Sequence, residues 1–419
     1  MLLPLLFMMQ LYILASSTLA SEGVPQPVTD RKSLSVELHA HLFMKEGMSW
    51  LFRGDFEGPI RAHSWTDKLS SQTNAETLDD SGIGILVVSL YAHPFLTFSL
   101  RDSIRRQIKL TEVFVKQHPN WIIARSSLEA HRALSQGKRI LILSLEGASG
   151  ILETEEDLKE FVDRDGLRIV TLLHLTDDEY GGVAFLRGFR AMASPLAWTT
   201  QLFHPLYSPD DEGIQINRKG LTDRGFKLAQ ALLKRGIWID LAHSSDVSQE
   251  ALIPLLKNAG HPLLYTHTVL RNFHQAERGI SEKQLLEVKN TQGIVGLMPS
   301  EEMLEGTQVP NDSCTGGVVA LGVQYEHIAG IIGSASTVLG TDYNGGITHL
   351  KPGCATETSL DQYGLYNISQ TKEIWIALQK LGVHTPVPLS SSVDRFLNAW
   401  GSVRTPGEAM SPSELLEKR

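Results

Sequence analysis

The chain has 419 residues, enough for one large domain or two domains of ordinary size. Its 42% hydrophobic and 20% charged residues are typical of a folded globular protein and argue against a disordered or fibrous chain. A net charge of −9, without basic stretches, argues against general binding to nucleic acid or to anionic lipid.

The first twenty residues predict export. MLLPLLFMMQLYILASSTLA is an apolar stretch that ends in small residues, with Thr18 and Ala20 flanking a candidate cleavage point. Its start lacks Lys and Arg, so an uncleaved N-terminal anchor stays open as the alternative. No later stretch has 18 uninterrupted apolar residues. We therefore expect residues 1–20 to be a signal peptide of a periplasmic or extracellular protein, and 21–419 to form one soluble domain without a stable membrane span.

Short apolar runs recur along the rest of the chain, and each is followed by a polar loop and then by a helical pattern. The eight runs cover residues 33–41, 82–93, 139–147, 168–176, 236–244, 262–268, 293–299 and 336–344. Nearly continuous apolar runs are typical of strands that are buried on both faces of a parallel sheet. Each run therefore predicts one strand.

Helical patterns occupy four of the intervals. They cover residues 101–117, 127–137 (beginning at a serine cap, Ser127), 221–236 and 281–293. Ser281 and Gln284 have the spacing of a capping box at the start of the last helix.

Alternation of strand and helix predicts an α/β fold, a (β/α)8 TIM barrel of the metal-dependent hydrolase type. The alternative is a doubly wound open sheet, which is disfavoured because no G-x-G-x-x-G follows the first strand. Two long loops, 177–219 and 343–368, interrupt the pattern after the fourth and eighth strands, and both fall on the carboxyl-terminal face of the barrel.

Residues that bind metals gather at the ends of the predicted strands. They are His39, His41, Glu146, His174, His243, His267 and Asp342. In a barrel these ends form one ring around a single cavity. A lone buried histidine is usually a hydrogen-bonded core residue, but the set as a whole predicts a metal centre. His93, one step beyond the ring, is structural or faces the substrate.

The number of candidate ligands exceeds what one zinc ion needs. Two metal ions that share Glu146 as a bridging carboxylate fit the set better. A bridging water would become hydroxide near neutral pH, and the ions would polarise the scissile carbonyl. Asp342 would take the proton and deliver it to the leaving amine.

The order of SLEGA, LLHLTDDEYGG, DLAHSS, LLYTHTVLRN and VLGTDYNG resembles the membrane (renal) dipeptidase family of zinc peptidases, which are amidohydrolase-like barrels. The resemblance implies that Glu146 bridges two zinc ions and that His243 and His267 bind the second. It also implies that His174 stabilises the oxyanion and contacts the substrate, that Arg278 holds the substrate carboxylate, and that Asp342 is the acid/base residue.

The chain departs from the family pattern at several positions. The first strand of the family usually carries His-x-Asp, whereas this chain has His39-x-His41, the pattern of the wider amidohydrolase barrels. The family's Asp-Phe-Asp-Gly becomes Asp342-Tyr343-Asn344-Gly345. The loop 177–219 is long and carries Arg187, Arg190 and Trp198. These differences affect the expected substrate more than the expected chemistry.

The sequence thus predicts an exported zinc-dependent dipeptidase acting on short peptides with a free carboxylate. The alternative is another amidohydrolase reaction in the same binuclear site, on an N-acyl amino acid or a lactone. A catalytically silent binding protein is disfavoured because the metal-type residues and Asp342 are all retained. Side-chain preference, metal identity and oligomeric state stay open, a homodimer being one alternative.

The chain has two cysteines, Cys314 and Cys354, in the loops after the seventh and eighth strands. Both loops leave the same face of the predicted barrel from neighbouring strands. In an exported protein we expect a disulfide between them, with two unpaired thiols as the alternative.

Overall fold

The computed structural model describes residues 31–45, 71–94, 96–184, 207–307, 309, 317–353 and 356–404. The predicted signal peptide, both cysteines, and Arg187, Arg190 and Trp198 lie outside these ranges. None of the described helices is long and apolar enough to cross a membrane.

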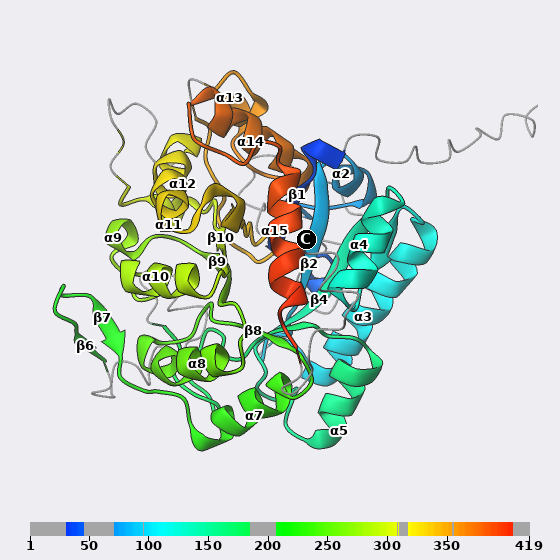
Figure 1. Ribbon diagram of the computed structural model, residues 1–419, viewed down its shortest axis with the longest axis vertical. Coiled ribbons are helices and arrows are strands. Elements are labelled where there is room, and N and C mark those ends of the chain that lie inside the picture. The colour runs from blue at the N-terminus through cyan, green and yellow to red at the C-terminus, as the bar shows by residue number, and fades with distance from the viewer. Residues whose placement is uncertain are drawn as a thin grey trace, which may run out of the picture.

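Eight parallel strands close a barrel in the order β1-β2-β4-β5-β8-β9-β10-β11, and β11 pairs back with β1 (Figure 1). The strands are β1 (Ser35–Ala40), β2 (Ile83–Leu90), β4 (Arg139–Glu146), β5 (Ile169–Thr171), β8 (Trp238–Asp240), β9 (Leu264–Thr268), β10 (Ile294–Leu297) and β11 (Thr337–Leu339). Each lies within one of the eight predicted runs. The predicted (β/α)8 barrel is confirmed.

Helices surround the barrel. The longer ones are α3 (Leu100–Gln117), α4 (Ser127–Ser135), α7 (Asp223–Leu233), α8 (Asp246–Asn258), α10 (Glu282–Asn290), α12 (Val318–Ile332), α14 (Thr371–Lys380) and α15 (Ser390–Gly401). The shorter ones are α2 (Ala75–Asp79), α5 (Glu155–Asp157), α9 (Arg271–His274), α11 (Glu301–Leu304) and α13 (Ser359–Tyr363). The four predicted helices are confirmed as α3, α4, α7 and α10.

The helix starts follow local capping chemistry. The predicted capping box of α10 is confirmed: Ser281 accepts from the backbone N–H of Gln284, and the Gln284 side chain bonds back to the cap. The predicted cap of α4 is wrong by one residue. Ser126 is extended and its hydroxyl accepts from the N–H of Glu129, whereas Ser127 is already helical.

Several short elements lie outside the predicted pattern. The short strand β3 (Trp121–Ile123) pairs with the amino-terminal part of β4, on the edge of the sheet. A hairpin of β6 (Tyr207–Pro209) and β7 (Gln215–Asn217) lies in the predicted loop 177–219, and α13 lies in the loop 343–368.

Two apolar clusters form the core. The larger one fills the space between the strands and the surrounding helices. The smaller one joins inward-facing strand residues such as Ile85, Ile140 and Trp238 to Phe396 and Trp400 of α15. Helix α15 also contacts the segments that precede β1 and β11, so it covers the amino-terminal end of the barrel and leaves the opposite end for the site (Figure 1).

Candidate metal centre

The seven predicted strand-end residues converge at the carboxyl-terminal end of the barrel. His39 and His267 lie within β1 and β9, Glu146 ends β4, and the other four follow β1, β5, β8 and β11. Three overlapping sets of their ligand atoms each lie within 4.8 Å of one another: His39, His41 and Asp342; His39, Glu146 and His267; Glu146, His174 and His243. The predicted convergence is therefore a feature of the structure.

Glu146 is the centre of this cluster, because five imidazole nitrogens surround its carboxylate. The distances from Nε2 to the nearest Glu146 oxygen are 3.4 Å for His39, 3.4 Å for His41, 3.5 Å for His174, 3.3 Å for His243 and 3.5 Å for His267. His41 faces Oε2, and the other four face Oε1. One carboxylate can thus reach ligands on both sides of the cluster.

The remaining distances divide the cluster into two groups. Asp342 Oδ1 lies 3.2 Å from His41 Nε2 and 3.9 Å from His39 Nε2. On the other side, the Nε2 atoms of His243 and His267 are 2.9 Å apart. His39 belongs to both sides, because its ligand atom also lies within 4.8 Å of that of His267, and the number of metal ions stays a prediction. His174 Nε2 lies as close to Glu146 as the Nε2 atoms of the predicted ligands do, so distance does not distinguish it from them.

A single hydroxyl orients one histidine of each group. Thr266 Oγ1 donates to Asp240 Oδ2 at 2.6 Å and contacts Nδ1 of both His39 (3.2 Å) and His267 (2.9 Å). Because a hydroxyl has only one proton, which goes to Asp240, both Nδ1 atoms must be the donors. Both rings therefore carry a proton on Nδ1 and turn Nε2 toward the cluster, the orientation that a metal ligand needs.

Asp240 is itself held by four donors. They are the hydroxyls of Thr171 and Thr266 and the backbone N–H groups of Ala242 and Thr266. The sequence analysis did not single out Asp240 or Thr266. Their position in the sequence could have pointed to them. Asp240 lies three residues before His243, and Thr266 lies directly before His267.

His41 is oriented differently. Its Nδ1 lies 3.0 Å from the backbone oxygen of Ser89, and this carbonyl can only accept, so Nδ1 carries the proton and Nε2 faces the cluster. The imidazole that stands where the family has a carboxylate is thus also prepared to bind a metal.

Burial and mutual charge set the protonation of the cluster. Burial lowers the pKa of His174 to about 4, although Glu146 opposes the shift. Burial, with Arg278 and neighbouring histidines, also holds the pKa values of His243 and His267 well below their usual range. Burial alone would raise the pKa of Glu146, but the surrounding histidines hold it well below its usual value. His39 differs from these three histidines: burial would lower its pKa, but Glu146 and Asp342 raise it above its usual value. A metal ion binds the neutral form of an imidazole, so binding at His39 would release a proton where the ring is charged.

The donor types of these residues fit a bound metal ion. The donor set combines neutral imidazole nitrogens with carboxylate oxygens, which suits borderline divalent ions such as zinc. His39 Nε2 is buried and has no hydrogen-bond partner within the described ranges, as expected of an atom that binds something else. His39, His41, Glu146, His243 and His267 are the residues that would hold the ions.

The backbone is strained at two of the site residues. His243 has φ of 65° and Asp342 has φ of 56°, in the left-handed region that non-glycine residues rarely adopt. Such conformations persist only where the surrounding structure imposes them, and they cluster at functional sites. They turn both side chains into the cluster directly after β8 and β11.

Arg278 lies beside the second group. Its Nη2 donates to the backbone oxygen of His267 at 2.8 Å and lies 3.2 Å from His243 Nε2. The loop that carries it is held by Arg271, whose guanidinium donates to the backbone oxygens of Glu277 and Gly279 and pairs with Asp246 at 2.6 Å. Arg278 is thus held beside His243 and His267, and its expected role in binding the substrate carboxylate stays a prediction.

Asn344, which replaces the second family acid, braces the end of β1. Its amide donates to the backbone oxygen of His41 at 2.8 Å and to the Thr73 hydroxyl at 2.9 Å. Its Oδ1 accepts from the backbone N–H of Gln72 and from Lys45 Nζ. In this chain the position therefore supports the strand that carries His39 and His41.

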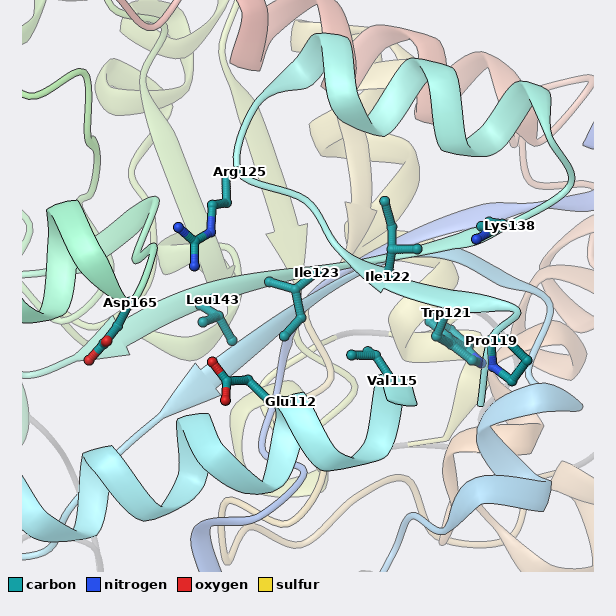
Figure 2. A pocket seen from close by; sticks show the side chains of 10 residues that line it. All are labelled: Glu112, Val115, Pro119, Trp121, Ile122, Ile123, Arg125, Lys138, Leu143 and Asp165. Carbon is teal, nitrogen blue, oxygen red and sulfur yellow. The ribbon is translucent and has the colours of Figure 1, made fainter. Parts of the chain in front are cut away.

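A cavity of about 100 Å³ opens onto the cluster between β2, β4 and β5. Glu146 and His174 line its inner end, and Tyr91, His93 and Asp178 line other sides. His93 is part of this lining, and its role, structural or substrate-facing, stays a prediction. A larger cavity of about 350 Å³ lies outside the barrel between α3 and β3, and none of the candidate site residues lines it (Figure 2).

Comparisons with known proteins agree with this geometry. The family model of the membrane dipeptidases (peptidase family M19) matches residues 31–355. The chain is 24% identical to dipeptidase 3 of Rattus norvegicus over 289 residues, which cover 68% of this chain and 51% of that protein. It is 19% identical to dipeptidase verJ of Clonostachys rogersoniana over 331 residues, 75% of this chain and 76% of that protein. It thus spans about half the length of the rat relative.

Among solved structures, the fold is similar to that of a metallopeptidase from Rhodobacter sphaeroides, solved with a phosphinate mimic of the dipeptide L-Ala-D-Ala. The TM-score is 0.63 at 14% identity, and the match covers 88% of this chain and 99% of that chain. At this identity the likeness shows the shared barrel fold.

Proposed function

The chain belongs to the membrane dipeptidase family, and on that premise we propose that it is a zinc-dependent dipeptidase that hydrolyses the peptide bond of short peptides. The observation that carries the proposal is the single buried carboxylate of Glu146, which has five imidazole nitrogens within 3.3–3.5 Å. A structural ion would need only four ligands in a closed site, whereas this cluster borders a cavity.

Each zinc ion would have its own pair of histidines. His39 and His41 would hold the first ion, His243 and His267 the second, and Glu146 both. Bound zinc would supply Lewis-acid polarisation of the scissile carbonyl and would lower the pKa of a bound water.

Asp342 would accept the proton of the attacking water and later give it to the leaving amine. Its carboxylate lies at the edge of the first group, 3.2 Å from His41 Nε2, where such a transfer is within reach. His174 would stabilise the developing oxyanion. Because burial lowers its pKa to about 4, it can donate an N–H as a neutral imidazole.

Arg278 would bind the terminal carboxylate of the peptide. A guanidinium can form two parallel hydrogen bonds with a carboxylate, which gives both affinity and orientation. The fixed position of Arg278 beside His243 would place this carboxylate next to the second ion.

Export through residues 1–20 would bring the enzyme to extracellular or periplasmic peptides. The apolar stretch at the start of the sequence supports this part of the proposal.

The second candidate is hydrolysis of an N-acyl amino acid or a lactone in the same site. His41 favours it, because its Nε2 faces the cluster where the dipeptidase pattern has a carboxylate. Arg278 is compatible with an N-acyl amino acid, which also ends in a carboxylate.

Metal analysis combined with a dipeptide assay tests the proposal. We expect close to two zinc ions per chain and hydrolysis of free dipeptides, with amidated dipeptides as poor substrates. Arg278→Lys should raise KM for free dipeptides, because lysine cannot make the paired bonds. No metal after reconstitution, or no hydrolysis of any dipeptide in a zinc-loaded sample, would reject the dipeptidase; equal rates on free and amidated peptides would reject the role of Arg278.

A further inference from the structure

The cavity beside the metal cluster has an acidic wall. Asp178 lines it together with Glu146, His174 and Tyr91. The acids on either side of it in the sequence, Asp177 and Glu179, form side-chain hydrogen bonds with other residues. Asp177 accepts from the backbone N–H of Val183 and from Asn217, and both oxygens of Glu179 accept from the Ser149 hydroxyl.

Only one oxygen of Asp178 is used by the fold. Its Oδ1 accepts from the backbone N–H groups of Tyr180 (2.8 Å) and Gly181 (3.2 Å). No hydrogen bond ends on Oδ2 within the part of the chain that the structure describes. The side chain is therefore held in a fixed orientation while Oδ2 is left for the cavity.

Within the described residues the Asp178 carboxylate forms no ion pair. Lys219 donates its Nζ to the backbone oxygen of Asp178 at 2.8 Å instead of to the carboxylate. Burial raises the pKa of Asp178 to about 7, Glu179 adds to the shift, and Lys219 opposes it. A cationic group bound in the cavity would supply the missing charge.

Asp178 and Arg278 follow different strands of the barrel, β5 and β9. The cavity is bordered by β2, β4 and β5, whereas Arg278 follows β9, which lies opposite β2 in the ring of eight strands. A chain of contacts joins the cavity to Arg278. The Tyr91 ring packs against the His174 ring, His174 packs against His243, and Arg278 contacts His243. An anion in the cavity wall and a cation beside His243 thus lie at two separate places next to the cluster, as the two charged ends of a dipeptide would require.

We propose that Asp178 binds the α-ammonium group of the substrate and makes the enzyme select peptides with a free amino terminus. This inference rests on the proposed dipeptidase function and names the determinant that would separate dipeptides from N-acyl amino acids. The free oxygen of Asp178 would accept a charge-assisted hydrogen bond from the ammonium group, while the cavity would hold the first side chain.

The matched substrates are alanyl-alanine and propionyl-alanine, which differ only by the α-amino group. For the parent enzyme we expect kcat/KM to be roughly 10- to 100-fold higher for alanyl-alanine, the effect of one hydrogen bond to a charged group. Asp178→Asn should remove most of this difference by lowering the value for alanyl-alanine, mainly through KM. Asparagine keeps Oδ1 for the backbone donors, so folding should be preserved.

Glu179→Gln is the control, because it changes a neighbouring acid that bonds to Ser149, and it should keep the substrate ratio of the parent. A parent enzyme that hydrolyses both substrates equally well would overturn the inference without any variant. So would an Asp178→Asn enzyme with an unchanged ratio. Neither result would contradict the dipeptidase proposal. Hydrolysis of propionyl-alanine but not of alanyl-alanine would reject both the dipeptidase proposal and the role of Asp178.

Discussion

The two ends of the barrel interior are built from the same strands but with opposite chemistry. On β2 and β4, the register pairs Ile85 with Ile140, then Val87 with Ile142, and then Ser89 with Ser144. On β5 and β8, Ile169 pairs with Trp238, and Thr171 with Asp240. Each strand thus runs from an apolar side chain at the amino-terminal end to a polar one near the cluster.

The difference shows how one fold separates stability from chemistry. The apolar end packs against α15 and gains free energy from burial alone. The polar end buries carboxylates and imidazoles, which costs free energy unless each group has a partner or a ligand. We therefore expect substitutions at the two ends to affect different measurements, and the following predictions test this separation from the largest effect to the smallest.

Glu146→Ala should abolish both metal binding and activity. This residue is the only carboxylate that contacts histidines of both groups in the described part of the chain, so its loss affects both ions. Elemental analysis of folded protein should find close to no zinc. Retention of one ion per chain would show that Glu146 serves only one site.

Asp342→Asn should lower kcat by roughly 10²–10⁴-fold while metal content stays near normal, as for a residue that moves a proton. The measurement is steady-state kinetics with elemental analysis on the same sample. Wild-type turnover would remove Asp342 from the mechanism. Loss of one ion would instead show that Asp342, 3.2 Å from His41 Nε2, is a ligand of the first group.

The sequence predicted most of this architecture because its signals are local. Apolar runs identified all eight barrel strands, and their last residues identified the cluster. The edge strand β3 escaped because the apolar stretch around it, residues 121–124, is shorter than any of the eight runs that contain the barrel strands. Helix α15 was missed although its buried residues Val393, Phe396, Leu397 and Trp400 have helical spacing, so the sequence held a signal for it. The roles of Asp240 and Thr266 depend on how β8 and β9 align, and no local pattern reports that.

Phe396→Ala tests the apolar end. Phe396 is fully buried in the cluster that contains Trp238, so its truncation should lower the free energy of unfolding by about 3–5 kcal/mol. Urea denaturation measures the change, and the zinc content per folded chain should stay the same. Phe226→Ala on α7 is the control, because Phe226 is 38% exposed and its loss should cost far less. Loss of zinc from folded Phe396→Ala protein would contradict the separation of the two ends.

Thr266→Val tests the polar end without touching a proposed ligand. Valine has nearly the shape of threonine but cannot accept from Nδ1 of His39 and His267, which lie 3.2 and 2.9 Å from the hydroxyl. Because one histidine of each group loses its orienting partner, zinc affinity should fall by roughly 10- to 100-fold at both sites. Competition with a chelator measures it.

Thr171→Val is the matched control for this variant. The Thr171 hydroxyl also donates to Asp240 at 2.6 Å, but it makes no hydrogen bond to a histidine in the described structure. This variant should therefore keep the zinc affinity of the parent, and Thr266→Ser, which restores the hydroxyl, should come close to it. If Thr171→Val and Thr266→Val weaken binding equally, the effect would come from Asp240 and the strand rather than from the orientation of the two rings. If Thr266→Val weakens only one site, the hydroxyl would orient one ring, and the two metal groups would be independent of each other.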